Sequence, residues 1–254
     1  MTPNDVPRYN VLGVGVSALT FDQACLLLVG AKGARDPGYV CLCTVHGVDE
    51  AARDPAYRSI LNHSWLTTPD GMPIVWMGPA SVERVYGPDL LLAVCDRGRA
   101  AGLRHFFYGG KPGVAAELAA RLSGRYPGLE VAGSRSPPFR DLTSGELDAL
   151  RTEVAAARAD IVWVGLGTPK QERFMAGPGL TLAAGLLVGV GAAFDFHSGR
   201  VPQAPPWMRR SGLEWLFRLF TEPRRLAGRY LVSNTTFILR LAASKLGLRR
   251  YPVS

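Results

Sequence analysis

Residues 39–45, with the sequence YVCLCTV, form an apolar run that is followed at once by His46. A run of this length is typical of a strand buried on both faces of a parallel sheet. Cys41 and Cys43 flank a single leucine, so their side chains point to the same face and cannot be a metal-binding CxxC pair. The run predicts a buried strand whose carboxyl end presents Thr44 and His46. His46 is interpreted either as a base or sugar contact or as an ordinary loop histidine.

A second strand, predicted at residues 64–68, leads into Asp70. Between the two strands, the sequence predicts one helix over residues 48–63. After Asp70, Gly71 allows a sharp turn and Pro73 suits the first turn of a following helix. Asp70 is thus placed at a strand-to-helix turn, where α/β proteins build their sites. Two interpretations stay open here: Asp70 caps the next helix, or Asp70 is catalytic.

Further strands are predicted at residues 104–108, 160–166 and 185–190, of which 160–166 (DIVWVGL) should be central because it is apolar. Residues 9–19 are predicted as a strand, followed by a helix from Thr20. The alternation of strands and helices predicts an α/β fold with a Rossmann-like, doubly wound and mostly parallel sheet. After the three strands come these candidate site residues: Gly109, Gly110, Lys111, Gly167, Thr168, Gln171, Glu172 and Asp195.

The loop GGKPG at residues 109–113 stands between a strand and a helix. Free N–H groups at a helix N-terminus can cradle a phosphate, and Lys111 adds a mobile charge. The loop lacks the GK[ST] ending of a Walker motif, so binding of a phosphate or nucleotide sugar and plain turn geometry both stay open. Gly13 and Gly15 lack a third glycine at dinucleotide spacing and are interpreted as a turn at a strand end.

The net charge of +8 is concentrated at the C-terminus, because residues 203–254 hold ten basic and two acidic residues. The sequence therefore predicts two domains, a catalytic body of residues 1–202 and a basic helical appendage of residues 203–254. Helices are expected over residues 207–220 and from Pro223 onward. Basic residues interleaved with tryptophan and leucine are typical of helices at a membrane interface. The alternative is a helical cap with a solvated basic face.

The polar, proline-containing start of the sequence predicts no signal peptide, and no apolar run reaches the roughly 20 residues that span a bilayer. The four cysteines lie in apolar runs and are interpreted as buried reduced thiols, which favours a cytoplasmic protein. A basic tail requires a polyanionic partner, either a nucleic acid or an anionic membrane surface. The alternative functions are a nucleic-acid-binding protein that uses the tail, which lacks a known signature, and a dehydrogenase, which lacks the dinucleotide fingerprint.

Several segments together resemble one known family. These are TTPDGMPIVW (67–76), ERVYGPD (83–89), FFYGGKPGVA (106–115), VGLGTPKQERFM (164–175), GVGAAFDFHSGRVPQAPPWMRRSGLEWLFRL (189–219) and EPRRLAGRYL (222–231). In this order they are similar to the WecG/TagA/CpsF glycosyltransferases, family 26. The resemblance implies an inverting hexosyltransferase that needs neither metal nor cofactor. It implies a nucleoside-diphosphate sugar as donor and a polyprenyl-diphosphate-linked saccharide as acceptor, at the cytoplasmic membrane face and in cell-surface polysaccharide synthesis.

The resemblance also implies roles for individual residues. Asp70, in the PDG motif, would be the general base that takes the proton of the acceptor hydroxyl. Arg84 and the appendage arginines Arg218, Arg225 and Arg229 would stabilise the leaving diphosphate or contact the membrane. Gln171 and Asp195 match family positions near the nucleotide sugar. Relatives of this kind exchange between monomer and oligomer.

The sequence departs from the family pattern before Asp70. Relatives commonly carry a Thr-x-Asn motif there, and ungapped counting places Leu42 and Thr44 at its two ends. Thr44 or His46 would have to replace the missing contact to the donor. Relatives use UDP-N-acetylmannosamine, UDP-glucose or UDP-glucuronate, and the sequence does not choose among them.

Overall fold

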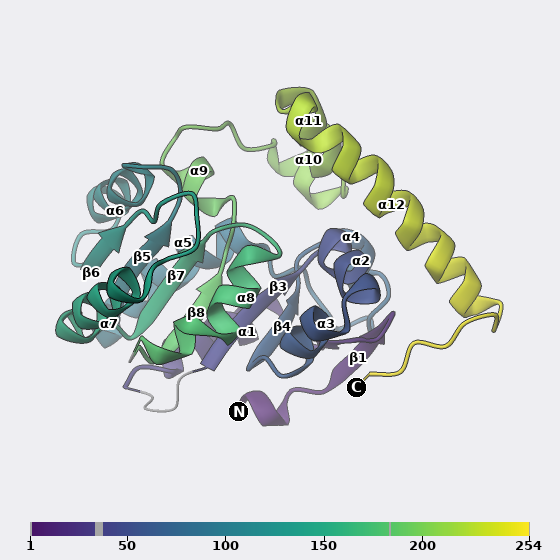
Figure 1. The fold of residues 1–254 in the computed structure, drawn as a ribbon, viewed down its shortest axis with the longest axis horizontal. Coiled ribbons are helices and arrows are strands. Elements are labelled where there is room, and N and C mark those ends of the chain that lie inside the picture. Colours follow the sequence, from purple (N-terminus) through teal and green to yellow (C-terminus); the bar gives the residue numbers. More distant parts are fainter. Residues whose placement is uncertain (1, 34–37, 183, 254) are drawn as a thin grey trace.

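Six parallel strands form one sheet in the order β4-β3-β8-β7-β5-β6 (Figure 1). The computed structural model describes residues 2–33, 38–182 and 184–253, without the side chains of residues 225, 227 and 229–231. The strands are β3 (Gly38–Cys43), β4 (Leu66–Pro69), β5 (Arg104–Gly109), β6 (Glu130–Arg135), β7 (Ile161–Gly165) and β8 (Leu186–Gly189). The predicted α/β fold is confirmed, and the apolar run that begins at Asp160 supplies β7, one of the two central strands.

Helices cover both faces of the sheet, and each face has its own apolar core. Alternate strand residues supply the two cores, with Phe107 and Trp163 on one face and Phe106 and Val162 on the other. The first face packs against α1 (Phe21–Gly30), α5 (Gly87–Arg97), α6 (Val114–Arg125) and α9 (Ala193–His197). The second packs against α2 (Val45–Arg53), α3 (Pro55–Asn62), α7 (Ser144–Ala157) and α8 (Lys170–Ala176). The remaining short elements of the body are η1 (Pro3–Asp5), α4 (Met72–Val75), η2 (Gly98–Ala101) and η3 (Pro178–Thr181).

The N-terminal segment differs from its prediction. Instead of one strand, β1 (Arg8–Val11) and β2 (Val14–Ser17) form an antiparallel hairpin that lies outside the main sheet. Leu12 and Gly13 both have positive φ at the turn, which is the backbone that a tight hairpin requires. Gly13 and Gly15 therefore belong to this hairpin, as a turn residue and a strand residue.

The single helix predicted over residues 48–63 is also wrong, because two helices occupy this part of the chain. Asp54 ends α2 and caps α3, with its carboxylate accepting hydrogen bonds from the N–H groups of Ala56 and Tyr57. Pro55 stands at the first turn of α3 and cannot donate the hydrogen bond that a continuous helix needs there.

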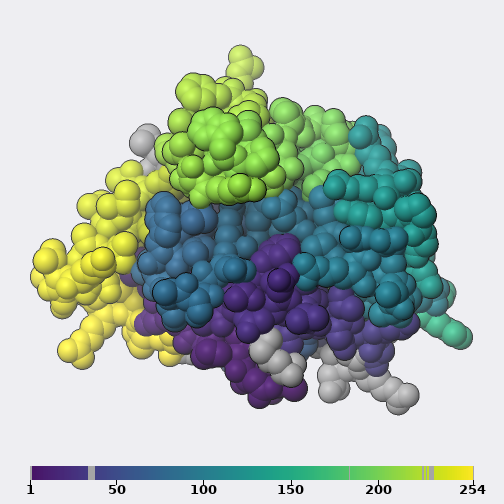
Figure 2. Space-filling model, turned by 180° about the vertical axis from the view of Figure 1, so that it is seen from behind, coloured from purple at the N-terminus to yellow at the C-terminus, as the bar shows by residue number. Residues whose placement is uncertain are grey.

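The appendage consists of α10 (Pro206–Arg210), α11 (Glu214–Thr221) and α12 (Pro223–Lys245). The helix predicted over residues 207–220 is interrupted at Gly212, which has a φ of +72°. Figure 1 shows α10 and α11 above α4, and α12 running down beside α2 toward the hairpin. In Figure 2 the light-green segment that holds α10 and α11 sits across the top of the body.

Buried contacts attach the appendage to the body along its length. Asp49 of α2, 1% exposed, pairs with Arg240 of α12 and accepts a 2.6 Å hydrogen bond from Thr236. Phe237 is buried in the second core, and the carbonyl of Tyr251 accepts a hydrogen bond from Asn10 on the hairpin. Within the described residues, no helix is both long enough and apolar enough to cross a bilayer. The division at residue 202 stays a prediction.

Candidate functional site

The parallel strands bring the predicted site residues to one edge of the sheet. Thr44 follows β3, Asp70 follows β4, Gly110 follows β5 and Gly167 follows β7. The backbone N–H groups of Asp70 and Gly71 both donate to the carbonyl of Cys43, at 3.0 and 3.3 Å. These two bonds tie the turn after β4 to the end of β3, because the strands are parallel neighbours. The edge is the carboxyl edge, where α/β proteins bind ligands.

Asp70 does not cap the helix that follows it. The N-cap of α4 is Gly71, which has no side chain to offer, and Pro73 lies in the first turn as predicted. Instead, the Asp70 carboxylate faces Arg84, with 3.3 Å between Asp70 Oδ1 and Arg84 Nη2. The Asp70 side chain is 15% exposed, so the carboxylate is mostly shielded and still open to solvent. Of the two interpretations of Asp70, the capping role is excluded.

Arg84 is the residue that joins the body to the appendage at this site. Its Nε donates to the backbone carbonyl of Asp70, and its Nη1 donates to the carbonyl of Arg209 at 3.1 Å. Its Nη2 reaches Glu214 Oε2 at 2.8 Å, in addition to Asp70. The guanidinium also lies over the ring of Tyr86, 4.2 Å from the centroid, in a cation–π contact.

Glu214 is a site residue that the sequence interpretation missed. It stands at the start of α11, is 9% exposed, and accepts a 2.7 Å hydrogen bond from the hydroxyl of Tyr86. Two signals were available, its rarity, since residues 203–254 hold two acidic residues, and its place in the segment 189–219 that resembles the family. A carboxylate in a basic segment is unremarkable by itself, and the role depends on a contact with a residue 130 positions away.

Burial raises the pKa of Asp70 to about 6. Arg84 lowers this pKa through its charge and its hydrogen bond, Glu214 raises it, and Arg218 lowers it. Removal from water disfavours the charged carboxylate, and here that effect exceeds the attraction of the two arginines. A carboxyl group with a pKa near neutrality can accept a proton and release it again under physiological conditions.

The appendage is docked beside the site by a second ion pair. Arg209 Nη1 lies 2.8 and 2.9 Å from the two carboxylate oxygens of Asp89, in the first turn of α5. The guanidinium carbon of Arg218 lies 5.5 Å from the centroid of the Phe196 ring. Arg218 Nη2 lies 3.9 Å from Glu222 Oε1. The predicted appendage residues Arg225 and Arg229 lie on α12, and their side chains are outside the described part of the structure.

Thr44 and His46 lie at the start of α2. The Thr44 hydroxyl is 3.2 Å from the N–H of Gly47 and caps the helix by accepting its hydrogen bond. His46 Nδ1 is 3.2 Å from the hydroxyl of Ser233 on α12, so this histidine faces the appendage. If Thr44 contacted a sugar donor, it would do so through the hydroxyl that already caps α2.

Gln171 and Glu172 form a buried pair under the loop that follows β7. They are 3% and 1% exposed. The Gln171 amide accepts from the N–H of Gly167 at 3.2 Å and donates to Glu172 at 2.9 Å, and the hydroxyl of Thr168 donates to Glu172 at 3.0 Å. Burial raises the pKa of Glu172. The geometry gives these two residues the role of holding the loop in shape.

The glycine-rich loop after β5 lies close to the end of β7. A side chain at Gly109 would come within 2.6 Å of the Gly165 backbone, and the N–H of Gly110 donates to the Gly165 carbonyl at 3.0 Å. Lys111 is exposed, and Asp195 is half-buried on α9. The N-terminus of α6 has no side-chain cap, and the N–H of its first residue, Val114, donates to the carbonyl of Lys111 at 3.0 Å.

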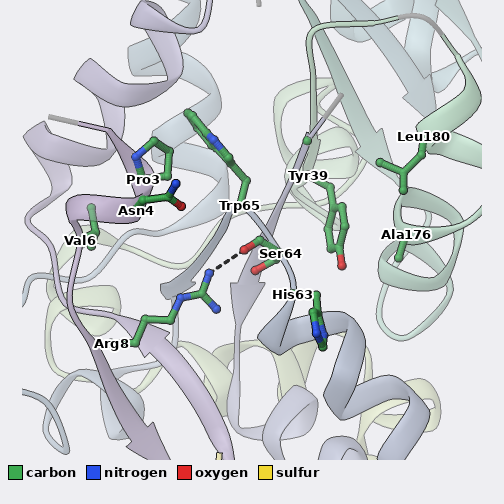
Figure 3. Close-up of a pocket in the computed structure, with 11 residues that line it drawn as sticks. Pro3, Asn4, Val6, Arg8, Tyr39, His63, Ser64, Trp65, Ala176 and Leu180 are labelled. Carbon is green, nitrogen blue, oxygen red and sulfur yellow. Dashed lines mark hydrogen bonds between the residues drawn. The ribbon is translucent and has the colours of Figure 1, made fainter. Parts of the chain in front are cut away.

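A hollow of about 750 Å³ lies at the opposite edge of the sheet (Figure 3). It is lined by Tyr39, which lies near the start of β3, and by Trp65, which precedes β4. Arg8 points into it, and its guanidinium donates to the carbonyls of Asn62 and Ser64. The hollow is therefore separate from the site at Asp70. Among the described residues, no three His, Cys, Asp or Glu side chains are grouped to hold a metal ion.

The sequence of the chain matches a known protein family and a named relative. A family model described as Glycosyl transferase WecG/TagA/CpsF family matches residues 9–251. Over 180 residues the chain is 33% identical to the N-acetylglucosaminyldiphosphoundecaprenol N-acetyl-beta-D-mannosaminyltransferase of Bacillus spizizenii. That alignment covers 69% of this chain and 68% of the relative. The family match includes Asp70, Arg84 and Glu214, so it spans both the body and most of the appendage.

Proposed function

Because the chain belongs to the WecG/TagA/CpsF family and is therefore a glycosyltransferase, we propose that it moves a hexosyl group from a UDP-sugar to a polyprenyl-diphosphate-linked saccharide with inversion at the anomeric carbon. The family membership sets aside the nucleic-acid-binding and dehydrogenase alternatives. The relative in Bacillus spizizenii is named for transfer of an N-acetylmannosaminyl group to a diphosphoundecaprenol-linked N-acetylglucosamine. N-acetylmannosaminyl is accordingly the first donor group to test, with glucosyl and glucuronosyl groups next.

The observation that carries the proposal is the Asp70 carboxylate, which is shielded but accessible at the carboxyl edge of the sheet and has a pKa of about 6. In the proposed reaction an acceptor hydroxyl oxygen forms a bond to the anomeric carbon. The bond between that carbon and the diphosphate oxygen breaks, and the hydroxyl proton passes to Asp70. A positioned carboxylate of this kind typically contributes about 10²–10⁴-fold to the rate.

The leaving diphosphate needs positive charge or N–H donors on the opposite side. We assign this role to Arg218, Arg225 and Arg229 of the appendage, together with the N–H groups at the start of α6. Arg84 is already bonded through Nε, Nη1 and Nη2, so its contribution to the diphosphate is limited to the N–H of Nη1 that remains. No metal or cofactor enters this scheme.

The proposed location is the cytoplasmic membrane surface, where the lipid-linked acceptor would lie. Its support is an exposed aromatic set on the appendage, Trp207, Trp215 and Phe220, next to the basic residues of α10 and α11. Aromatic and basic side chains on one short helical segment are typical of binding to a membrane interface. The chain would attach peripherally in this scheme.

The direct test is transfer by the purified protein in detergent micelles. A synthetic polyprenyl-diphosphate N-acetylglucosamine serves as acceptor, and UDP-N-acetylmannosamine, UDP-glucose and UDP-glucuronate serve as donors. We expect one donor to give a lipid-linked disaccharide whose new bond has the inverted anomeric configuration by NMR. A product with retained configuration would contradict the role of Asp70, since a general base acting alone inverts the centre.

A further inference from the structure

The guanidinium of Arg84 is shared unequally between two carboxylates. Its Nη2 lies 2.8 Å from Glu214 Oε2 and 3.3 Å from Asp70 Oδ1. Charge-assisted N–H···O bonds are usually about 2.7–2.9 Å long, so the bond to Glu214 is a full one and the bond to Asp70 is weak. Arg84 therefore pairs mainly with Glu214 of the appendage, and only weakly with Asp70, the candidate base.

Glu214 is itself held in place by the body. Its other oxygen, Oε1, accepts the hydrogen bond from the Tyr86 hydroxyl at 2.7 Å, and the residue is 9% exposed. Tyr86 in turn lies against the Arg84 guanidinium and accepts a 3.3 Å hydrogen bond from the amide of Gln203. Both oxygens of Glu214 therefore have a partner, so its position is fixed when α11 is docked.

We propose that Glu214 is a positioning residue that holds Arg84 away from a full ion pair with Asp70, so that Asp70 is a stronger base when the appendage is docked. This inference rests on the proposed role of Asp70. An arginine paired fully with a base would keep the base ionised but would lower its affinity for a proton. Glu214 prevents that loss by competing for the same nitrogen, and the open, undocked arrangement would leave Asp70 paired with Arg84 alone.

The charged and titratable groups that face Asp70 come from three parts of the chain. Arg84 lies in the loop before α5, Glu214 and Arg218 lie on α11, and the thiol of Cys43 ends β3. The charge of Glu214 raises the pKa of Asp70, while Arg84 and Arg218 lower it. Removing the Glu214 charge should lower the pKa of Asp70 for two reasons. It deletes a like charge, and it allows Arg84 to pair more closely with Asp70.

The test measures the pKa of Asp70 directly and does not depend on the identity of the substrate. In the full chain labelled with ¹³C at aspartate carboxyls, the Asp70 signal is identified as the one missing from Asp70→Asn. We expect Glu214→Gln to lower the pKa of Asp70 by roughly one unit. Tyr86→Phe, which removes the hydrogen bond that fixes Glu214, should lower it by a smaller amount.

Asp89→Asn is the matched control, because it also removes one carboxylate that pairs with an arginine across the same interface. Its partner is Arg209, and the Asp89 side chain is 46% exposed, so the loss weakens docking only slightly. We expect the pKa of Asp70 to stay unchanged in this variant. An unchanged pKa in Glu214→Gln, or an equal shift in Asp89→Asn, would overturn the inference.

A second readout separates this inference from the proposed function. In the transfer assay, the acid limb of kcat/KM should move to lower pH in Glu214→Gln, and kcat at a saturating donor concentration should fall by up to about tenfold, the limit for a base whose pKa drops by roughly one unit. If the wild type transfers no sugar, or if Asp70→Asn retains its rate, the proposed function fails whatever Glu214 does. If Asp70→Asn is inactive and Glu214→Gln keeps the acid limb of the wild type, the positioning role of Glu214 is disproved and the proposed function stands.

Discussion

Asp70 and Arg84 face each other across 3.3 Å at the carboxyl edge of the sheet, and the arginine also holds the backbone carbonyl of the same aspartate. Arg84 therefore fixes the turn that carries the candidate base without neutralising its carboxylate completely. This arrangement explains how a mostly buried carboxyl group keeps a pKa of about 6 beside an arginine.

The first prediction concerns Asp70 itself. We expect Asp70→Asn to lower the transfer rate by about 10²–10⁴-fold, because an amide cannot take the acceptor proton. The melting temperature should change little, since the substitution keeps the shape and removes no helix cap. Steady-state transfer and thermal denaturation are measured together. Asp141→Asn, at an exposed loop position, is the control, and a rate near that of the control in Asp70→Asn would disprove the base assignment.

The second prediction is the pH dependence of transfer. A base must be ionised to act, so its active fraction falls as the pH drops through its pKa. With the pKa of Asp70 at about 6, kcat/KM should rise about tenfold per pH unit below pH 6 and level off above it. The profile is recorded from pH 4.5 to 8, with circular dichroism to confirm that the protein stays folded. If the acid limb of the profile had its midpoint near pH 4, the ordinary pKa of an aspartate, the site would not shield this carboxyl group.

The third prediction concerns attachment to membranes. Replacing Trp207, Trp215 and Phe220 together by serine should weaken binding to vesicles of anionic lipid at least tenfold, since these residues are 41–78% exposed and large apolar side chains at a basic surface favour insertion. Deleting residues 203–254 should lower both binding and activity, the latter because Glu214 is lost as well. Co-sedimentation with vesicles measures the binding. Phe139→Ser, at an 89% exposed aromatic residue of the body, is the control, and equal losses in both variants would remove the appendage from this role.

The fourth prediction concerns the attachment of α12. Arg240→Ala should lower the free energy of unfolding by about 2 kcal/mol, because Asp49 is 1% exposed and would lose a charged partner, keeping Arg53 and Thr236. Denaturant titration measures the change. Lys245→Ala, at an exposed position on the same helix, should change it by less than about 0.5 kcal/mol. An equal effect of the two substitutions would mean that the ion pair with Asp49 does not stabilise the docked helix.

Local signals predicted much of the body correctly. The apolar runs that become β3 and β7, and the Gly71 and Pro73 turn after Asp70, act over a few residues and depend little on the rest of the chain. The break at Asp54 was equally local, since an aspartate before a proline is a helix start, and the single-helix prediction overlooked it. The hairpin at Gly13 was missed because a strand-end turn and a hairpin turn have similar sequences.

The sequence by itself determined the parallel sheet, the edge at which Asp70 stands and the basic character of the last fifty residues. Each of these follows from the periodicity of side chains, from turn residues or from charge, which are local properties. Only the tertiary structure decided that Glu214 meets Arg84 and Tyr86, and that Gln171 and Glu172 are buried under their own loop. A hydrogen bond between residues 130 positions apart depends on how α11 packs against the loop before α5, and no spacing in the sequence records that packing.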